Sequence, residues 1–246
     1  MDYSSLARSY NALSYTYQLR ELLGGFFQTD KYAHLSKYEL VKTINDTVFK
    51  HYESEQILKY LLAREIINKK YVAAFEVKVK SSRTDFLVIN GDTKAYEIKS
   101  KLDNLNRLEK QVSDYGDVFE YNTVVLDKSH LLGSLKIIPD YYGVWYFEHG
   151  KKHIYRAAQL SPKIDSAEQL NILNKKELLK SFHTINIAQI LSTYDYDSIN
   201  LALKLALKER YLKRWNFIQT NWNEILPIDL QFFFNSNIRP DIIYEL

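Results

Sequence analysis

The sequence contains no cysteine. Disulfide bonds, thiolate metal sites and thiol catalysis are therefore excluded. Glycine and proline are also scarce, with 7 and 4 residues among 246, and no stretch has the composition of a flexible linker. The phosphate-binding pattern G-x-x-x-x-G-K-[ST] is missing as well, so this chain is not expected to use ATP as an energy source.

Long hydrophobic runs are absent too. No apolar stretch approaches the roughly 18 residues that a membrane span needs. The N-terminus has an acidic residue, Asp2, near its start and does not resemble a signal peptide. We therefore expect a cytoplasmic protein with no membrane partner. The formal net charge is only +3, which permits nucleic-acid binding through a local basic patch alone.

Hydrophobic periodicity divides the chain into three regions. Apolar residues recur at helical spacing before residue 70 and again after residue 165, whereas the stretch between them contains strand-like patterns. We expect an N-terminal helical segment over residues 1–50, a core over 51–160 and a helical C-terminal region over 161–246. The last region is predicted to contain helices at 166–182, 184–192 and 195–218.

The middle region predicts a sheet that begins with an antiparallel meander. Its three strands are expected at 72–80, 84–89 and 94–99, and Asn90-Gly91-Asp92 between the last two is a strong turn signal.

A helix is expected to follow the meander. Asp103 can cap this helix, which would run to about Phe119. A right-handed connection through it would place the next strand, 122–126, parallel to the third strand. The predicted core is completed by a short helix at 129–136 and by strands at 142–147 and 152–156.

Three charged side chains meet in the predicted hairpin. Glu97 and Lys99 point to the same face of their strand, because side chains alternate along it. Folding at the Asn-Gly turn places Asp85 opposite residues 97–99. Hard divalent cations such as Mg²⁺ bind carboxylate and carbonyl oxygens, so Asp85, Glu97 and the backbone carbonyl of Ile98 are candidate ligands. Such an ion would activate water for phosphodiester hydrolysis, and Lys99 would position that water or stabilise the developing charge.

The same pattern also suits a solvated hairpin edge. There the acids and the lysine would form surface ion pairs worth about 0–1 kcal/mol. A D-x(n)-E-x-K spacing arises by chance in a charged protein, so the spacing alone leaves both interpretations open.

The most specific motifs lie in residues 83–126, namely Arg83-Thr84-Asp85, the turn and Glu97-Ile98-Lys99-Ser100, followed by a helix and a strand. Together they resemble the core of the PD-(D/E)XK nuclease superfamily, which contains restriction endonucleases, Holliday-junction resolvases and RecB-like exonucleases. In particular, the chain is similar to a group of bacterial and phage proteins of this superfamily with R-x-D, Y-E-I-K-S and R-L-x-x-Q motifs. The resemblance implies an α/β fold with an αβββαβ restriction-endonuclease-like core, N-terminal helices and a helical C-terminal extension.

The resemblance adds candidate site residues. Gln111 and Tyr115 have the Q-x-x-x-Y spacing that RecB-like nucleases carry near the active site, and residues four apart share a helix face. The superfamily usually supplies one more acid from the helix before the first strand, where Glu55 is the main candidate and Glu65 another. Glu76, on the first strand itself, is a rival that the more similar group of proteins supports. The superfamily's proline is absent, because Thr84 precedes Asp85 here.

The resemblance implies a metal-dependent nuclease that uses Mg²⁺ or Mn²⁺ and acts on nucleic acid, DNA above all, in phage–host conflict or in mobile-element biology. The alternative is a catalytically silent module that binds nucleic acid or a protein partner, and a homodimer is compatible with either. Basic residues that would neutralise phosphates cluster around the predicted site: Lys78, Lys80, Arg83, Lys99, Lys101, Arg107 and Lys110.

Overall fold

The computed structural model describes residues 1–148 and 150–245, which form two compact units. The first unit combines residues 1–68 with the C-terminal segment from Asn216 onward, and the second contains Lys69–Trp215. Among the helices of the described residues, none is long and apolar enough to cross a membrane.

The second unit is built on a six-stranded sheet in the order β1-β2-β3-β4-β5-β6. Antiparallel pairing joins β1, β2 and β3, parallel pairing joins β3, β4 and β5, and β6 is antiparallel to β5. A mixed α/β fold and the predicted strands are thus confirmed. Their bounds are Val72–Val79 (β1), Ser82–Ile89 (β2), Thr93–Lys99 (β3), Tyr121–Asp127 (β4), Gly143–Glu148 (β5) and Lys151–Arg156 (β6).

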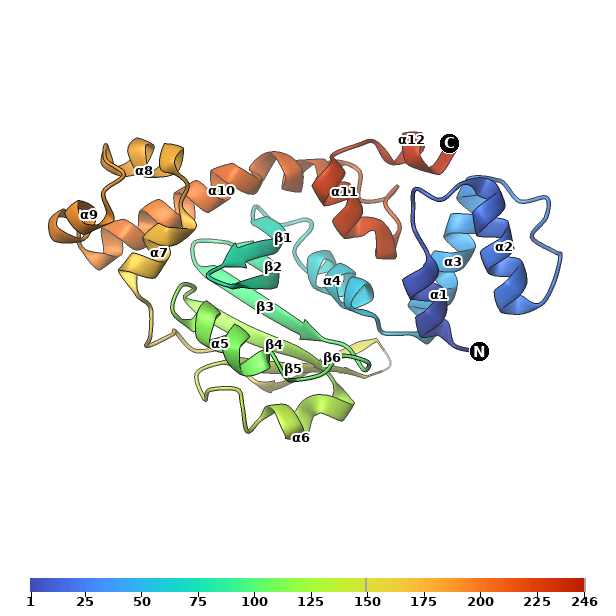
Figure 1. The fold of residues 1–246 in the computed structure, drawn as a ribbon, viewed down its shortest axis with the longest axis horizontal. Coiled ribbons are helices and arrows are strands. Elements are labelled where there is room, and N and C mark those ends of the chain that lie inside the picture. The colour runs from blue at the N-terminus through green and yellow to red at the C-terminus, as the bar shows by residue number, and fades with distance from the viewer. Residues whose placement is uncertain (149, 246) are drawn as a thin grey trace. The chain divides into compact units, whose positions relative to one another are not determined.

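Helix α5 (Leu108–Gly116) connects β3 to its parallel neighbour β4 and lies across one face of the sheet (Figure 1). Leu108 and Val112 of this helix pack on Val124 and other apolar side chains of that face. The predicted start at Asp103 is wrong. Its carboxylate instead accepts hydrogen bonds from the backbone N–H and the hydroxyl of Ser100, both at 2.7 Å, and closes a turn directly after β3.

Helix α10 (Tyr196–Thr220) packs on the opposite face of β2 near its C-terminal end, where the buried ring of Trp215 lies beside Phe86. Glu120, just before β4, links this helix to the sheet. Its carboxylate accepts hydrogen bonds from the Thr93 backbone N–H at 2.7 Å and from Lys204 of α10 at 3.0 Å.

The remaining helices of the second unit are short. A single helix at 166–182 was expected, but the chain breaks it into two, because Asn174 caps the second through its side-chain oxygen. The helices are η1 (Lys128–His130), α6 (Leu131–Ser134), α7 (Ser166–Ile172), α8 (Lys175–Phe182) and α9 (Ile187–Thr193).

The first unit is helical, as the apolar periodicity before residue 70 predicts. Leu40, Ile44 and Val48 share one fully buried face of α3. The helices are α1 (Tyr3–Ser9), α2 (Thr16–Phe27), α3 (Lys37–His51), α4 (Glu55–Arg64), η2 (Pro227–Asp229), α11 (Leu230–Ser236) and α12 (Pro240–Glu245).

The two compact units cross the boundaries that were expected at residues 50 and 160. Helix α4 groups with the N-terminal helices, and α7–α9 group with the sheet. Contacts between distant parts of the chain cause this division, and local sequence patterns carry no information about such contacts.

A buried carboxylate joins distant segments of the first unit. Asp229 is 3% exposed and accepts hydrogen bonds from the hydroxyls of Tyr10 and Tyr244, both at 2.9 Å, and from the side-chain amide of Asn45 at 3.4 Å. Burial raises the pKa of Asp229 to about 6, although these three donors oppose the rise. Both ends of the chain thus meet at one ionisable group.

This buried acid predicts a pH-dependent stability. The pKa of Asp229 is higher in the folded chain, at about 6, than its ordinary value of 3.8, so the folded state binds the extra proton between these values. Its stabilisation is therefore fully present below about pH 4 and is lost as the pH rises through about 6, with a total of about 3 kcal/mol.

Urea unfolding of the wild-type protein and of Asp229→Asn across this pH range measures the effect. The free energy of unfolding of the variant should lack this fall with pH, whereas Asp30→Asn, which removes an exposed acid of the same unit, should retain it. Identical pH profiles for the wild type and Asp229→Asn would refute the assignment.

Candidate metal site on the sheet

The strand register places three acids in a row. Phe75 faces Phe86 and Val77 faces Thr84 across β1 and β2, so Glu76 and Asp85 occupy facing positions. Facing residues of antiparallel strands project to the same side of the sheet.

The next strand continues the row. The pairing of β2 with β3 ends where Phe86 faces Tyr96, and beyond this point the Asp85 carboxylate reaches the backbone N–H of Ile98, the residue after Glu97. Lys99 lies two residues beyond Glu97 and projects to the same face. The predicted convergence of Asp85, Glu97 and Lys99 is thus present in the backbone register.

Glu76 has an unusual backbone conformation. Its φ of 57° lies in the left-handed region, which few residues other than glycine adopt within a strand. A carboxylate oxygen of Glu76 lies within 4.8 Å of one of Asp85. Strained backbone is tolerated where surrounding contacts enforce it, and such residues are frequent at functional sites.

Asp85 is tied to the neighbouring strand. Its Oδ2 accepts a hydrogen bond of 2.6 Å from the backbone N–H of Ile98. Ile98 therefore lies next to the carboxylate of Asp85, as the prediction of a shared metal site requires. The contact uses its N–H group, and the assignment of its carbonyl oxygen as a metal ligand stays a prediction.

Glu97 and Lys99 form a buried ion pair. They are 2% and 6% exposed, and the lysine Nζ lies 2.6 Å from Glu97 Oε1. The other oxygen, Oε2, accepts a hydrogen bond of 2.7 Å from the hydroxyl of Tyr115 on α5. Buried charges of this kind need such partners, because removal from water is costly.

Tyr115 stays a protonated hydrogen-bond donor in this setting. Burial, and next to it the negative charge of Glu97, raises the pKa of the phenol far above its ordinary value. The same hydroxyl lies 2.8 Å from the backbone oxygen of Arg83 in β2. Sequence reasoning singled out Tyr115 but did not identify it as a partner of Glu97. The sequence does hold a clue to this contact, because the helix after the third strand must cover the face that carries residues 97 and 99.

Gln111 lies on the same face of α5 as Tyr115 and is 9% exposed. A hydrogen bond from Gln111 opposes the rise of the Tyr115 pKa, which places its amide beside the phenol. Within the described part of the chain, the side-chain oxygen of Gln111 is buried and has no hydrogen-bond partner. An unsatisfied buried acceptor costs free energy, and a ligand with a donor or a positive charge would relieve this cost.

The candidate acids from the N-terminal part of the chain belong to the first unit. Glu55, in the first turn of α4, accepts a hydrogen bond of 2.5 Å from the buried ammonium group of Lys59, so it already has a structural partner. Glu65 follows the last turn of the same helix. Glu76 is the candidate that shares a unit and a sheet face with Asp85.

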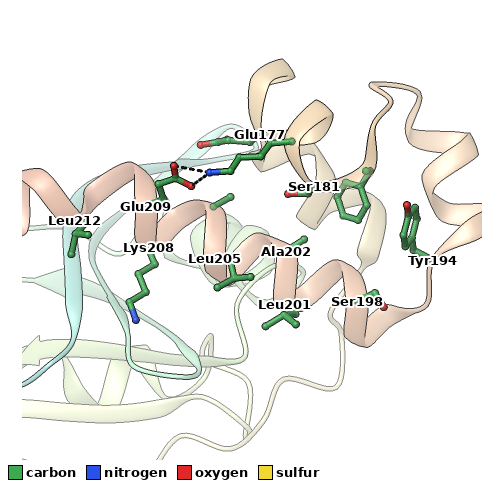
Figure 2. Close-up of a pocket in the computed structure, with 13 residues that line it drawn as sticks. Glu177, Ser181, Tyr194, Ser198, Leu201, Ala202, Leu205, Lys208, Glu209 and Leu212 are labelled. Atoms are coloured by element: carbon green, nitrogen blue, oxygen red, sulfur yellow. Dashed lines mark hydrogen bonds and ion pairs between the residues drawn. The ribbon is translucent and has the colours of Figure 1, made fainter.

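A separate recess of about 680 Å³ lies between α8 and α10, away from the strands that carry the acids (Figure 2). Leu201, Leu205 and Phe182 give it an apolar lining, and Lys180 and Glu209 form an ion pair at its rim. None of the residues predicted to act in catalysis lines this recess.

Comparison with known proteins identifies relatives of the chain. Residues 46–233 match the model of a family described as bacteriophage P4 protein cII. No curated protein matches the chain significantly. The SPO1766 protein of unknown function from Silicibacter pomeroyi is 17% identical, with 58% of this chain and 94% of that chain covered and a TM-score of 0.37.

The burial of Glu97 and Lys99 predicts that removing the lysine alone destabilises the protein more than replacing both residues. Lys99→Met should lower the free energy of unfolding by about 3 kcal/mol, because Glu97 is left buried without its cation. The double variant Glu97→Gln/Lys99→Met should recover at least about 1 kcal/mol of that loss, since no buried charge remains. Urea unfolding at neutral pH measures both values. Lys101→Met removes an exposed lysine two residues away and serves as the control; a Lys99→Met variant as stable as this control would contradict the analysis.

Proposed function

The chain belongs to the bacteriophage P4 protein cII family, and we propose that it is a metal-dependent nuclease that hydrolyses phosphodiester bonds in DNA. One observation carries the proposal: Glu76 and Asp85 occupy facing positions on β1 and β2, Asp85 reaches the backbone of Ile98 next to Glu97, and Lys99 pairs with Glu97. Carboxylates with an adjacent lysine are the groups that phosphodiester hydrolysis with a divalent cation requires.

The donor set fits Mg²⁺ or Mn²⁺. Carboxylate oxygens are hard ligands, and Asp85 and Glu76 approach each other closely enough to share one ion. Glu97 would supply a further oxygen, and the Ile98 carbonyl another. A divalent cation bound there would polarise the scissile phosphate and lower the pKa of a water molecule.

The chain's own residues would then act in distinct ways. Lys99 holds a positive charge beside Glu97, where it would stabilise negative charge on the phosphate during attack. The backbone N–H of Ile98 fixes the orientation of the Asp85 carboxylate. The Tyr115 hydroxyl and, beside it, Gln111 would hold Glu97 in place from α5. Such outer contacts orient metal ligands.

The order of elements supports a restriction-endonuclease-like core. Along the chain, α4 precedes β1, β2 and β3, and α5 leads to the parallel strand β4. This is the αβββαβ order that the motifs at residues 83–126 imply. The phage origin in the family description supports a role in phage biology, and an activity in phage–host conflict or mobile elements is part of the proposal.

One observation favours a second candidate function, a catalytically silent module that binds nucleic acid or a protein. Both oxygens of Glu97 already accept hydrogen bonds from protein donors, Lys99 and Tyr115. The ammonium group of Lys99 neutralises the carboxylate in such a pair without any metal ion, as in a purely structural site. In this candidate the fold would bind nucleic acid equally well with and without a divalent cation.

Cleavage assays separate the two candidates. The wild type should cut DNA with Mg²⁺ or Mn²⁺ and not with EDTA. Asp85→Asn should lower the rate by an amount on the order of 100-fold or more, because it removes a negative metal ligand while keeping the shape of the side chain. Gel analysis of single-stranded, duplex and branched DNA, with RNA as a further substrate, measures the products.

A matched control is Asp92→Asn in the β2–β3 turn, which removes an acid from the same hairpin outside the row of acids. It should cut as fast as the wild type. Equal rates for Asp85→Asn and Asp92→Asn would sink the nuclease proposal, and metal-independent DNA binding without cleavage would favour the silent module.

A further inference from the structure

Two exposed cations stand beside the acids on the β1–β2 hairpin. Lys78 and Arg83 are register partners, two positions along the hairpin from the facing pair of Glu76 and Asp85. Both side chains are exposed, whereas the neighbouring residues of the other face, such as Thr84, are buried. Because side chains alternate along a strand, Arg83 is expected on the side of Asp85 and Lys78 on the side of Glu76. Lys78 also lines a recess with Glu168 and Arg210.

Several other cations near the site already have acidic partners. Lys80 pairs with Asp117 at 2.8 Å, and Lys110 lies 3.5 Å from Asp114. Within the described part of the chain, neither the ammonium group of Lys78 nor the guanidinium group of Arg83 has an ion-pair partner. Their charges are thus available to an external anion.

The backbone of Arg83 lies close to the side chain that donates to Glu97. The Tyr115 hydroxyl lies within hydrogen-bond distance of the Arg83 carbonyl oxygen and of Glu97 Oε2, at 2.8 and 2.7 Å. One strand position further, the Thr84 hydroxyl donates to the Tyr96 carbonyl at 3.0 Å. Arg83 is therefore an exposed side chain on a backbone that is fixed relative to the acids, which favours specific binding because less ordering is needed.

The spacing suits a nucleic-acid strand. Residues two apart on a strand are separated by about 6.6 Å, so Arg83 projects to the same side as Asp85 at roughly the distance between successive backbone phosphates. The acids themselves repel a polyanion, and a nearby pair of free cations offsets this repulsion. A guanidinium group also matches the geometry of a phosphate with two parallel hydrogen bonds.

We propose that Arg83, with Lys78 beside it, binds the backbone phosphate next to the one that faces Asp85, and so positions a nucleic-acid strand on the hairpin. The inference rests on the nucleic-acid part of the proposed function. Arg83 is a substrate-binding residue in this account, and the strand would run along β2 toward the acids.

Fluorescence anisotropy with short labelled single-stranded and duplex DNA tests the inference, with Ca²⁺ in place of Mg²⁺ to suppress cleavage. Arg83→Gln should weaken binding about five- to tenfold at low salt, and the slope of log K against log salt should fall by about 0.9 for duplex DNA, as expected for one lost phosphate contact. Lys78→Gln should have an effect in the same direction. Lys136→Gln, an exposed lysine in the loop after α6, is the matched control and should bind as the wild type does.

The outcomes separate this inference from the proposed function. Weaker DNA binding by Arg83→Gln supports the inference even if the wild type cuts no substrate. Failure of the wild type to cut would reject only the hydrolysis part of the proposed function. Wild-type affinity and salt slope for Arg83→Gln overturn the inference, whether or not the wild type cuts DNA. A wild type that binds neither form of DNA also overturns it.

Discussion

A shift of one residue between β2 and β3 would carry Asp85 to the opposite face of the sheet from Glu97, because side chains alternate along a strand. The Asn90–Asp92 turn prevents this slip. Gly91 has a φ of 107°, which glycine adopts without strain, and the backbone N–H of Asn90 donates to the Asp92 carbonyl oxygen. The contact of Asp85 with Ile98 depends on this register, and it brings the Asp85 carboxylate to the strand that carries Glu97 and Lys99.

The second constraint is the burial of charge. Glu97 and Lys99 lie under α5, and a carboxylate in such a place is tolerated only with partners. Lys99 and Tyr115 supply them, so the helix that covers the sheet also defines the site. The same pair sets a condition on function. A cation that binds Glu97 must compete with Lys99 for the carboxylate, and the ammonium group then becomes available to a phosphate.

Much of this arrangement follows from local sequence. The alternation of residues 94–99 and the Asn-Gly turn predict the hairpin, and the contact of Asp85 with Ile98 places its carboxylate beside the strand that carries Glu97 and Lys99. The parallel pairing of β4 with β3 is confirmed as well. These features follow from short-range chemistry, which is why a single sequence contains them.

Other features depend on contacts that a local pattern does not show. The helix expected from Asp103 begins five residues later, because that carboxylate binds Ser100 instead. Glu76 adopts a left-handed conformation without being a glycine, so no sequence signal marks it. The central claim is that these acids hold a divalent cation, and anomalous diffraction from crystals soaked in Mn²⁺ tests it most directly. The account predicts one strong peak in coordination contact with the carboxylates of Asp85 and Glu97; a saturated crystal with no peak there, or with Lys99 still paired to Glu97 and Mn²⁺ bound only elsewhere, would contradict it.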